Sequence, residues 1–313
     1  MRHRIILDCD TGRDDAIAIA LALASPEEIE VVGIATVAGN VPLALTHRNT
    51  RFVCELCGRP DVKVHAGAAR PLLRPLATAE DAHGDTGLEG VTIVEPTMPL
   101  QAGHAVDFMI ETLAAAADDS ITLVPTGPLT NIALLALKAP ELLPKVKQIV
   151  LMGGAQTAGG NVTPAAEFNI AVDPHAAQIV LHCGRPVVAF GLDVTYRVLA
   201  GRTEQDRLLA SGRRAARELA PILSPMPGWS LARFGGARVV PMHDPCTIAW
   251  LVRPELFTLE PVNVEIETAS ELTLGQTVVD RWGVSGRCKN VHWAVDVDGA
   301  AVLELMVGRL CSV

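Results

Sequence analysis

The feature that most constrains the fold is a repeated alternation of short apolar runs and helical patterns along the chain. Runs rich in Val, Ile and Leu occupy residues 5–10, 28–40, 121–127, 147–154 and 186–192, and a helix-like segment follows each of them. Near-continuous apolar runs are typical of strands buried on both faces, and their alternation with helices indicates βαβ units. We therefore predict an α/β fold with an open, mostly parallel, Rossmann-like sheet flanked by helices.

The C-terminal part of the chain has a different pattern. Residues 262–268, 277–282 and 290–298 are short β-rich runs without intervening helices, which favours antiparallel strands near an edge of the sheet. No internal repeat, low-complexity tract or linker interrupts the sequence. A chain of 313 residues that is 49% hydrophobic can bury one large core. We expect a single α/β domain over residues 1–313.

Composition argues against two classes of partner. The formal net charge of −9 disfavours nucleic acid, because binding to phosphates needs a basic face. The first ten residues, MRHRIILDCD, contain too short an apolar run for a signal peptide, and no stretch has the uninterrupted length of a membrane span. We expect a cytoplasmic protein with no nucleic-acid or membrane partner, whose ligand is a hard cation or a neutral polar molecule.

Polar clusters follow four of the apolar runs. They read DCDTGRDD at residues 8–15, TVAGN at 36–40, VPTGPLTN at 124–131 and LMGGAQTAGGNVTPAAEFN at 151–169. In parallel α/β sheets, ligands bind beyond the carboxyl ends of the strands. The four clusters therefore predict one site at that edge of the sheet.

Four aspartates, Asp8, Asp10, Asp14 and Asp15, fall within eight residues. Carboxylates this close repel one another unless a cation lies among them. Asp14 and Asp15 open a helix, where the macrodipole favours negative charge, but helix capping does not explain Asp8 and Asp10 at the preceding strand end. Clustered carboxylates without thiolates or imidazoles suit Ca²⁺ or Mg²⁺. The pattern favours a metal site over a cluster that only caps the helix.

The stretch DCDTGRDD resembles the opening motif of the inosine-uridine-preferring nucleoside hydrolases. Phosphatases of the haloacid dehalogenase type also begin with a strand followed by DxDxT, so the rest of the chain has to decide between the two. Further segments resemble the hydrolase family in order, over residues 5–282: TVAGN, AHGDTGL, PTGPLTN, LMGG, NVTPAAEFN, VDP, MHDP and TVVD. The phosphatase needs a downstream lysine, and Lys145, Lys147 and Lys289 lie in unsuitable contexts.

The resemblance implies a Ca²⁺ cofactor and a set of residues around it. The implied metal ligands are carboxylates and one backbone carbonyl: Asp10, Asp15, Asp244 and Thr126. Asp10 would also be the general base that takes a proton from the attacking water. The implied sugar-binding residues are Asp14, Asn40 and Asn169 for the 2′- and 3′-hydroxyls, Asn161 and Glu167 for the 5′-hydroxyl, and Met152 beside the ring.

The nucleobase side is harder to predict. His243, next to Asp244, is the candidate proton donor to the departing base, and His83 is expected to line the same space; a neutral structural histidine is the alternative for His243. Trp229 and Phe234 lie in PGWSLARFGG, where relatives often carry tyrosines, and their rings could stack on a base. The single tyrosine, Tyr196, lies elsewhere, so the preference for purine or pyrimidine stays open.

Three functions follow from these observations. The favoured one is Ca²⁺-dependent hydrolysis of the N-glycosidic bond of ribonucleosides to free base and ribose, by an enzyme that the family resemblance implies to be a homo-oligomer, a dimer or a tetramer. Such a reaction needs an activated water, a grip on the sugar and a proton for the base. The alternatives are a Mg²⁺-dependent phosphatase with Asp8 as nucleophile, and a ribose- or nucleoside-binding protein without turnover.

Overall fold

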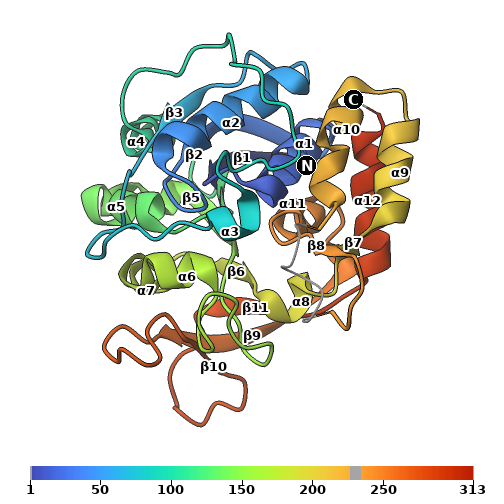
Figure 1. Cartoon of the computed structure of the whole chain (residues 1–313). Coiled ribbons are helices and arrows are strands. Elements are labelled where there is room, and N and C mark those ends of the chain that lie inside the picture. Colours follow the sequence, from blue (N-terminus) through green and yellow to red (C-terminus); the bar gives the residue numbers. More distant parts are fainter. Residues whose placement is uncertain (1, 226–233, 313) are drawn as a thin grey trace.

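The centre of the computed structural model, which describes residues 2–225 and 234–312, is a nine-stranded sheet (Figure 1). The strand order is β10-β9-β11-β6-β5-β4-β1-β2-β3. The strands are β1 (His3–Cys9), β2 (Ile29–Thr36), β3 (Val64–Ala66), β4 (Ile121–Pro125), β5 (Val146–Met152), β6 (Val187–Phe190), β9 (Phe257–Ile266), β10 (Thr277–Asp280) and β11 (Val291–Val297). A separate pair consists of β7 (Leu199–Ala200) and β8 (Val240–Pro241).

Most neighbouring strands are parallel, as the sequence predicts. Every pair from β3 through β2, β1, β4, β5 and β6 to β11 is parallel, whereas β9 pairs antiparallel with both β11 and β10. The reversal of direction in the C-terminal part is therefore confined to β9. In the register of the sheet, Asp8 lies opposite Ala35 of β2 and Pro125 of β4. The residues that follow these three strands consequently meet at one edge.

Helices cover both faces of the sheet (Figure 1). One layer holds α1 (Arg13–Leu23), α2 (Leu43–Leu56), α9 (Arg202–Ala210), α10 (Arg214–Leu219), α11 (Pro245–Val252) and α12 (Gly299–Leu310). The other holds α4 (Ala105–Ala114), α5 (Thr130–Lys138) and α7 (Pro174–Leu181). Shorter elements are α3 (Glu80–His83), α6 (Phe168–Val172), α8 (Leu192–Thr195) and the 3₁₀ turns η1 (Pro140–Lys145), η2 (Ala220–Leu223) and η3 (Pro254–Leu256). Among the described residues, no helix has the length and apolarity to cross a membrane.

The strands of the sheet have apolar side chains on both faces. In β1, Ile5 and Leu7 pack into the core under the layer of α1, whereas Ile6 packs into the core under α4 and α5. Successive side chains of a strand point to opposite faces, so a strand covered on both sides needs apolar residues at every position. This requirement explains why the strands read as unbroken apolar runs in the sequence.

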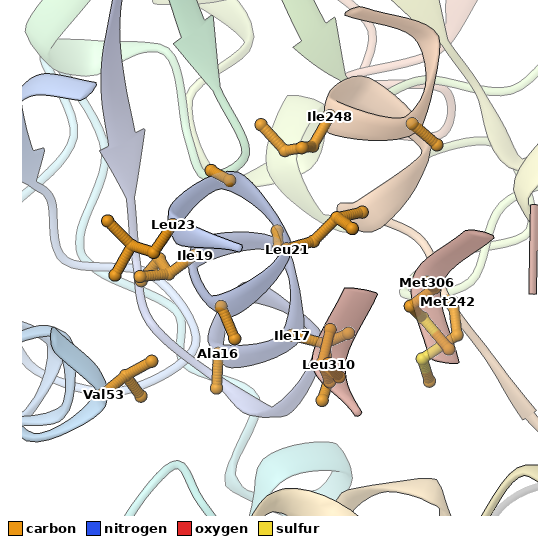
Figure 2. Packing of buried hydrophobic residues seen from close by; sticks show 14 of the residues in the cluster. Ala16, Ile17, Ile19, Leu21, Leu23, Val53, Met242, Ile248, Met306 and Leu310 are labelled. Carbon is orange, nitrogen blue, oxygen red and sulfur yellow. The ribbon is translucent and has the colours of Figure 1, made fainter. Parts of the chain in front are cut away.

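Beyond its charged first turn, helix α1 is enclosed by other elements. All eleven of its residues are buried, and Figure 2 shows Ile17, Ile19 and Leu21 of α1 among Val53 of α2, Ile248 of α11 and Leu310 of α12. A helix that is apolar on every side belongs in a protein core. Its N-terminus follows β1 directly, so the aspartates of its first turn are fixed by the core itself.

Candidate active site

A cavity opens at the carboxyl edge of the sheet, where the polar clusters of the sequence meet. It is lined by residues from the start of α1, the segment after β2, α3, the end of β4, the β5–α6 segment and the segment before α11. Most residues predicted for the site line it: Asp14, Asn40, His83, Thr126, Met152, Asn161, Glu167, Asn169, His243 and Asp244. The parallel sheet therefore brings together residues that are up to 230 positions apart in the sequence.

Asp10 and Asp15 are fully buried and lie behind residues that line the cavity. Asp10 Oδ2 accepts the backbone N–H of Asn40 at 2.7 Å. Asp15 Oδ2 accepts the backbone N–H of Gly12 at 2.9 Å and the Asn40 side-chain amide at 3.1 Å, while its Oδ1 accepts the Thr126 hydroxyl at 2.7 Å. The ends of β1, β2 and β4 are thus joined through two carboxylates.

Two glycines allow the backbone to approach Asp10 closely. A Cβ at Gly39 would lie 2.1 Å from Asp10 Oδ2, and a Cβ at Gly127 would lie 2.7 Å from Asp10 Oδ1. Both distances are far shorter than a van der Waals contact, so a side chain at either position would displace the carboxylate. The glycines of TVAGN and PTGPLTN are needed for this reason.

The arrangement of carboxylates has the chemistry of a divalent-cation site. One oxygen from each of Asp14, Asp15 and Asp244 lies within 4.8 Å of the others. Asp10 Oδ1 is buried and has no hydrogen-bond partner. An all-oxygen donor set of this kind fits a hard cation such as Ca²⁺. The converging group includes Asp14, for which the sequence predicted a contact to sugar, and Asp10 lies next to this group rather than within it.

The titration behaviour of the cluster agrees with a site for a cation. Burial, reinforced by the neighbouring carboxylates, raises the pKa of Asp10 and of Asp244 well above their ordinary values. The same causes raise the pKa of Asp14 to about 7. Burial also raises the pKa of Asp15, although the hydrogen bonds from Gly12 and Thr126 oppose the shift. Charged carboxylates are unfavourable here unless positive charge lies among them.

The wall opposite the aspartates comes from β5 and α6. The Asn169 side-chain amide donates to the Thr126 carbonyl at 2.8 Å and to the Met152 carbonyl at 3.1 Å. The Glu167 carboxylate caps α6, accepting backbone N–H groups of Asn169 and Ile170 as well as that of Gly154. Burial raises the pKa of Glu167 to about 7 despite these bonds. Glu167 is therefore part of the local framework as well as of the cavity wall.

Asn161, on the segment between β5 and α6, lines the same wall. Its Oδ1 accepts the backbone N–H of Phe168 at 2.9 Å, which fixes the orientation of its side-chain amide.

His83 is held as a neutral ring. Its Nδ1 accepts the backbone N–H of Arg13 at 3.0 Å, so the ring proton is on Nε2. Burial, together with the nearby charges of Arg13 and His243, lowers the pKa of His83 to about 3. His83 can therefore donate a hydrogen bond to a ligand, but it carries no transferable acidic proton near neutral pH.

His243 lines the cavity from the segment before α11, next to Asp244 in the chain. A hydrogen bond of 2.7 Å joins His243 Nδ1 to the hydroxyl of Thr195, and the Tyr196 ring packs edge-on against the imidazole with centroids 5.3 Å apart. Phe234 packs in turn against Tyr196 at 5.6 Å and does not itself line the cavity. Trp229, the other aromatic residue predicted for the base, lies outside the described residues.

Asp8 has a structural task that argues against the phosphatase alternative. It is almost completely buried and does not line the cavity, and its Oδ1 accepts the side-chain amide of Asn131 at 2.8 Å. The same amide donates to the Thr36 carbonyl, and Asn131 Oδ1 accepts the Ala68 N–H. Asp8 therefore anchors Asn131, which joins β1 to the end of β2 and to the segment after β3, and it is not placed to attack a substrate.

Three residues around the site did not emerge from the sequence. Thr195 and Tyr196 contact His243, and Arg13 lines the cavity. The Arg13 guanidinium is buried and donates to the carbonyls of Ile222, at 2.7 Å, and of Ser224. The sequence could have indicated Arg13, because it is a basic residue inside the otherwise acidic motif DCDTGRDD. Thr195 had none, because its partner is 48 positions away.

The fold and the site together define a class: a parallel α/β protein with an acidic, oxygen-rich cavity at the carboxyl edge of its sheet. Comparison with known proteins makes the class specific. The family model described as inosine-uridine preferring nucleoside hydrolase matches residues 5–304. The chain belongs to this family, and it is a hydrolase that acts on N-glycosyl compounds.

Individual relatives agree with this assignment. The pyrimidine-specific ribonucleoside hydrolase RihA of Enterobacter sp. (strain 638) is 45% identical over 98% of this chain and 97% of its own length. The structure of a purine-preferring ribonucleoside hydrolase from Gardnerella vaginalis superimposes with a TM-score of 0.91 at 34% identity, covering 99% of this chain and 98% of that one. A plant nucleoside hydrolase superimposes with a TM-score of 0.92 at 30% identity, over the full length of both chains.

Proposed function

We propose that this protein is a Ca²⁺-dependent ribonucleoside hydrolase that prefers pyrimidine nucleosides and releases free base and ribose. The observation that carries the proposal is the convergence of Asp14, Asp15 and Asp244 beside the unpartnered Oδ1 of Asp10, in a cavity that also presents His243. An acidic cluster of this kind, next to a histidine, combines cation binding with the means to move two protons.

The residues present fit Ca²⁺. The carboxylates of Asp10, Asp15 and Asp244 and the carbonyl of Thr126 would hold the ion, with Asp14 close enough to contribute. When bound, the cation would lower the pKa of a water molecule and bind the vicinal hydroxyls of ribose. It would also neutralise carboxylates whose pKa burial and mutual repulsion raise.

The chemistry assigned to the chain is a displacement at C1′ of the ribose. A water oxygen forms the new bond to C1′ while the bond from C1′ to the base nitrogen breaks, and the electron pair of that bond moves to the base. Asp10 takes the proton from the water, using the oxygen that has no other partner. His243 gives a proton to the departing base, which would otherwise leave as an anion.

The polar side chains on the cavity wall would hold the sugar. Asn40, Asn161 and Asn169 each have one amide atom fixed by the protein, so their orientation is set before substrate arrives. We assign Asn40, Asn169 and Asp14 to the 2′- and 3′-hydroxyls, and Asn161 with Glu167 to the 5′-hydroxyl. Groups held in this way lose little entropy on binding.

The preference for pyrimidines is supported by the relatives of higher identity. RihA of Enterobacter sp. (strain 638), at 45% identity, is pyrimidine-specific, whereas the purine-preferring enzyme from Gardnerella vaginalis is 34% identical. The neutral His83, with its proton on Nε2, suits a carbonyl oxygen of the base, which uridine and inosine both carry, so the preference depends on the relatives alone.

Three other predictions accompany the proposal. One domain over residues 1–313 is supported by a sheet whose strands are drawn from residues 3 to 297. A cytoplasmic location and a homo-oligomer, dimer or tetramer, stay predictions.

The test is a reducing-sugar assay with uridine, cytidine and inosine, run with calcium and after removal of metal by a chelator. We expect ribose release with uridine or cytidine that is lost after chelation and restored by calcium. No release from any nucleoside in the presence of calcium would refute the activity, and faster release from inosine would refute the pyrimidine preference. Restoration by magnesium but not by calcium would refute the choice of metal.

A further inference from the structure

Helix α8 (Leu192–Thr195) contacts two parts of the cavity wall without lining the cavity itself. We propose that α8 is the positioning element of the site: Thr195 orients the His243 ring, and Asp193 holds the loop that carries Asn161. The inference rests on the proposed function, in which His243 protonates the departing base and Asn161 contacts the sugar.

Thr195 is placed to fix the rotation of the imidazole. The residue is completely buried, and its backbone N–H donates to the Gly191 carbonyl at 3.2 Å. The backbone that carries its hydroxyl is therefore held in place. That hydroxyl lies 2.7 Å from His243 Nδ1. A hydroxyl can accept from a protonated ring nitrogen and donate to an unprotonated one, so the contact suits both forms of the ring. With Nδ1 engaged, the direction of the Nε2 edge is determined by Thr195.

Tyr196 restricts the same ring in another way. It packs edge-on against the imidazole with centroids 5.3 Å apart and an interplanar angle of 66°. This packing limits the tilt of the ring plane, whereas the hydrogen bond to Thr195 determines which edge of the ring faces α8. Both contacts come from consecutive residues at the end of one short helix.

Asp193 holds the segment between β5 and α6. Its Oδ2 accepts the backbone N–H of Gln156 at 2.7 Å, and its Oδ1 accepts the N–H and the hydroxyl of Thr157, both at 2.7 Å, and the N–H of Ala158 at 3.0 Å. Hydrogen bonds to a charged acceptor are stronger than neutral ones. Asn161 follows three residues after this anchored stretch and lines the cavity.

The two contacts predict different kinetic defects. Loss of the Thr195 hydroxyl misdirects the proton donor, so it should slow substrates whose leaving group needs a proton. Loss of the Asp193 carboxylate loosens a wall that binds the sugar, so it should weaken binding of every riboside. A helix with only a structural role would give the same defect from either residue.

The experiment measures kcat and KM on uridine and on p-nitrophenyl riboside, with saturating calcium, for Thr195→Val, Thr195→Ser and Asp193→Asn. Two matched controls have similar contacts outside the cavity. Thr46→Val removes a buried hydroxyl that donates to the Leu43 carbonyl of its own helix. Asp280→Asn changes a carboxylate that accepts two backbone N–H groups of an exposed turn, those of residues 284 and 285.

We expect Thr195→Val to lower kcat for uridine about 20-fold, to change p-nitrophenyl riboside by less than about threefold, and to leave KM unchanged. Thr195→Ser keeps the hydroxyl and should restore uridine turnover to within about threefold of the parent. Asp193→Asn should raise KM about tenfold for both substrates with little change in kcat. Both controls should stay within about twofold of the parent on each substrate.

Equal losses on the two substrates in Thr195→Val, or the same pattern of defects in Thr195→Val and Asp193→Asn, would overturn the inference. His243→Ala is measured alongside to separate this from failure of the proposed function. If His243→Ala slows uridine selectively and Thr195→Val does not, the positioning role alone is wrong. If His243→Ala slows both substrates equally, the proton-donor role is wrong and the inference falls with it. Should Thr195→Val fail to fold, Thr195→Ala carries the same test.

Discussion

Two sides of the cavity are built in contrasting ways. The metal side consists of Asp10, Asp15, Asn40 and Thr126. It lies just after β1, β2 and β4 and in the first turn of α1, and buried hydrogen bonds connect its residues. The leaving-group side, consisting of His83, His243, Tyr196 and Phe234, lies on short helices and connecting segments. The first side is continuous with the buried edge of the sheet, and the second side is assembled from short helices and loops outside the sheet.

The difference indicates how one fold separates two demands. In the proposed mechanism, attack of water on the ribose, which is common to all substrates, depends on the side that the core holds in place. Recognition and protonation of the base, which vary between substrates, would depend on segments that lie outside the sheet. The following experiments test the two sides separately, by changing a residue, the substrate or the pH.

The largest effect is expected from the metal side. Asp10→Ala and Asp15→Ala each remove a proposed ligand of the cation, and without the cation the remaining carboxylates repel one another. We therefore expect uridine turnover to fall by about 10⁴-fold or more. Elemental analysis should show loss of calcium in the same samples. Asp61→Ala, which breaks an exposed ion pair with Arg59, is the control and should keep both. Full calcium occupancy in the Asp10 and Asp15 variants would contradict the ligand assignment.

The sugar tests the metal side without a mutation. 2′-Deoxyuridine lacks a hydroxyl that we assign to Asn40, Asn169 and Asp14, so these polar groups would lose a partner. We expect kcat/KM to be about 10³-fold lower than for uridine, since buried polar groups reject an analogue that lacks their partner. Similar values of kcat/KM for the two nucleosides would show that the site does not bind the 2′-hydroxyl as proposed.

On the leaving-group side, His243→Ala should lower turnover of uridine about 100-fold, because the base then departs without a proton. Cleavage of p-nitrophenyl riboside should fall much less, since its phenolate needs no proton to leave. Asp10→Ala should lower both, because the attacking water is common to them. Parallel losses in His243→Ala, together with weaker calcium binding, would instead mean that His243 only orients Asp244.

The smallest expected effect is the pH dependence of stabilisation by calcium. Burial raises the pKa of Asp14 and of Asp8 to about 7 in the folded chain, from ordinary values near 4. The metal-free folded protein then binds more protons than the unfolded chain in this window, so its stability falls as pH rises from about 4 to 7. In the proposed site, calcium would take the place of the proton on Asp14 at higher pH, whereas Asp8 lies outside the cavity.

We therefore expect calcium to raise the melting temperature by about 5 °C more at pH 8 than at pH 5. Differential scanning calorimetry with and without calcium at both values measures this, and the difference should vanish in Asp15→Ala. A larger shift at pH 5 would show that calcium and protons do not compete for these carboxylates.

The contrast also explains what could be predicted from the sequence. The parallel sheet could be predicted from the alternation of apolar runs and helical patterns. A cation site at its carboxyl edge could be predicted from the local cluster DCDTGRDD, whereas the individual ligands were implied by the family resemblance. The antiparallel pairing in the C-terminal part was foreseen too, although not that β11 would lie parallel to β6. Contacts of Thr195 with His243 and of Arg13 with Ile222 depend on how loops distant in the chain approach each other, which no periodicity records.

The burial of α1 on every side has a consequence for how this sequence can vary over evolutionary time. An ordinary surface helix accepts polar replacements on its exposed face, so the positions that vary between relatives follow the helical period. Helix α1 has no exposed position among its eleven residues, so we expect no position in it to accept substitutions without a cost in stability. Beyond its charged first turn, residues 16–23 consist of alanine, isoleucine and leucine, and we expect them to change only by exchange among small and branched apolar residues. We therefore expect this segment, which connects the acidic cluster to the core, to vary slowly between relatives.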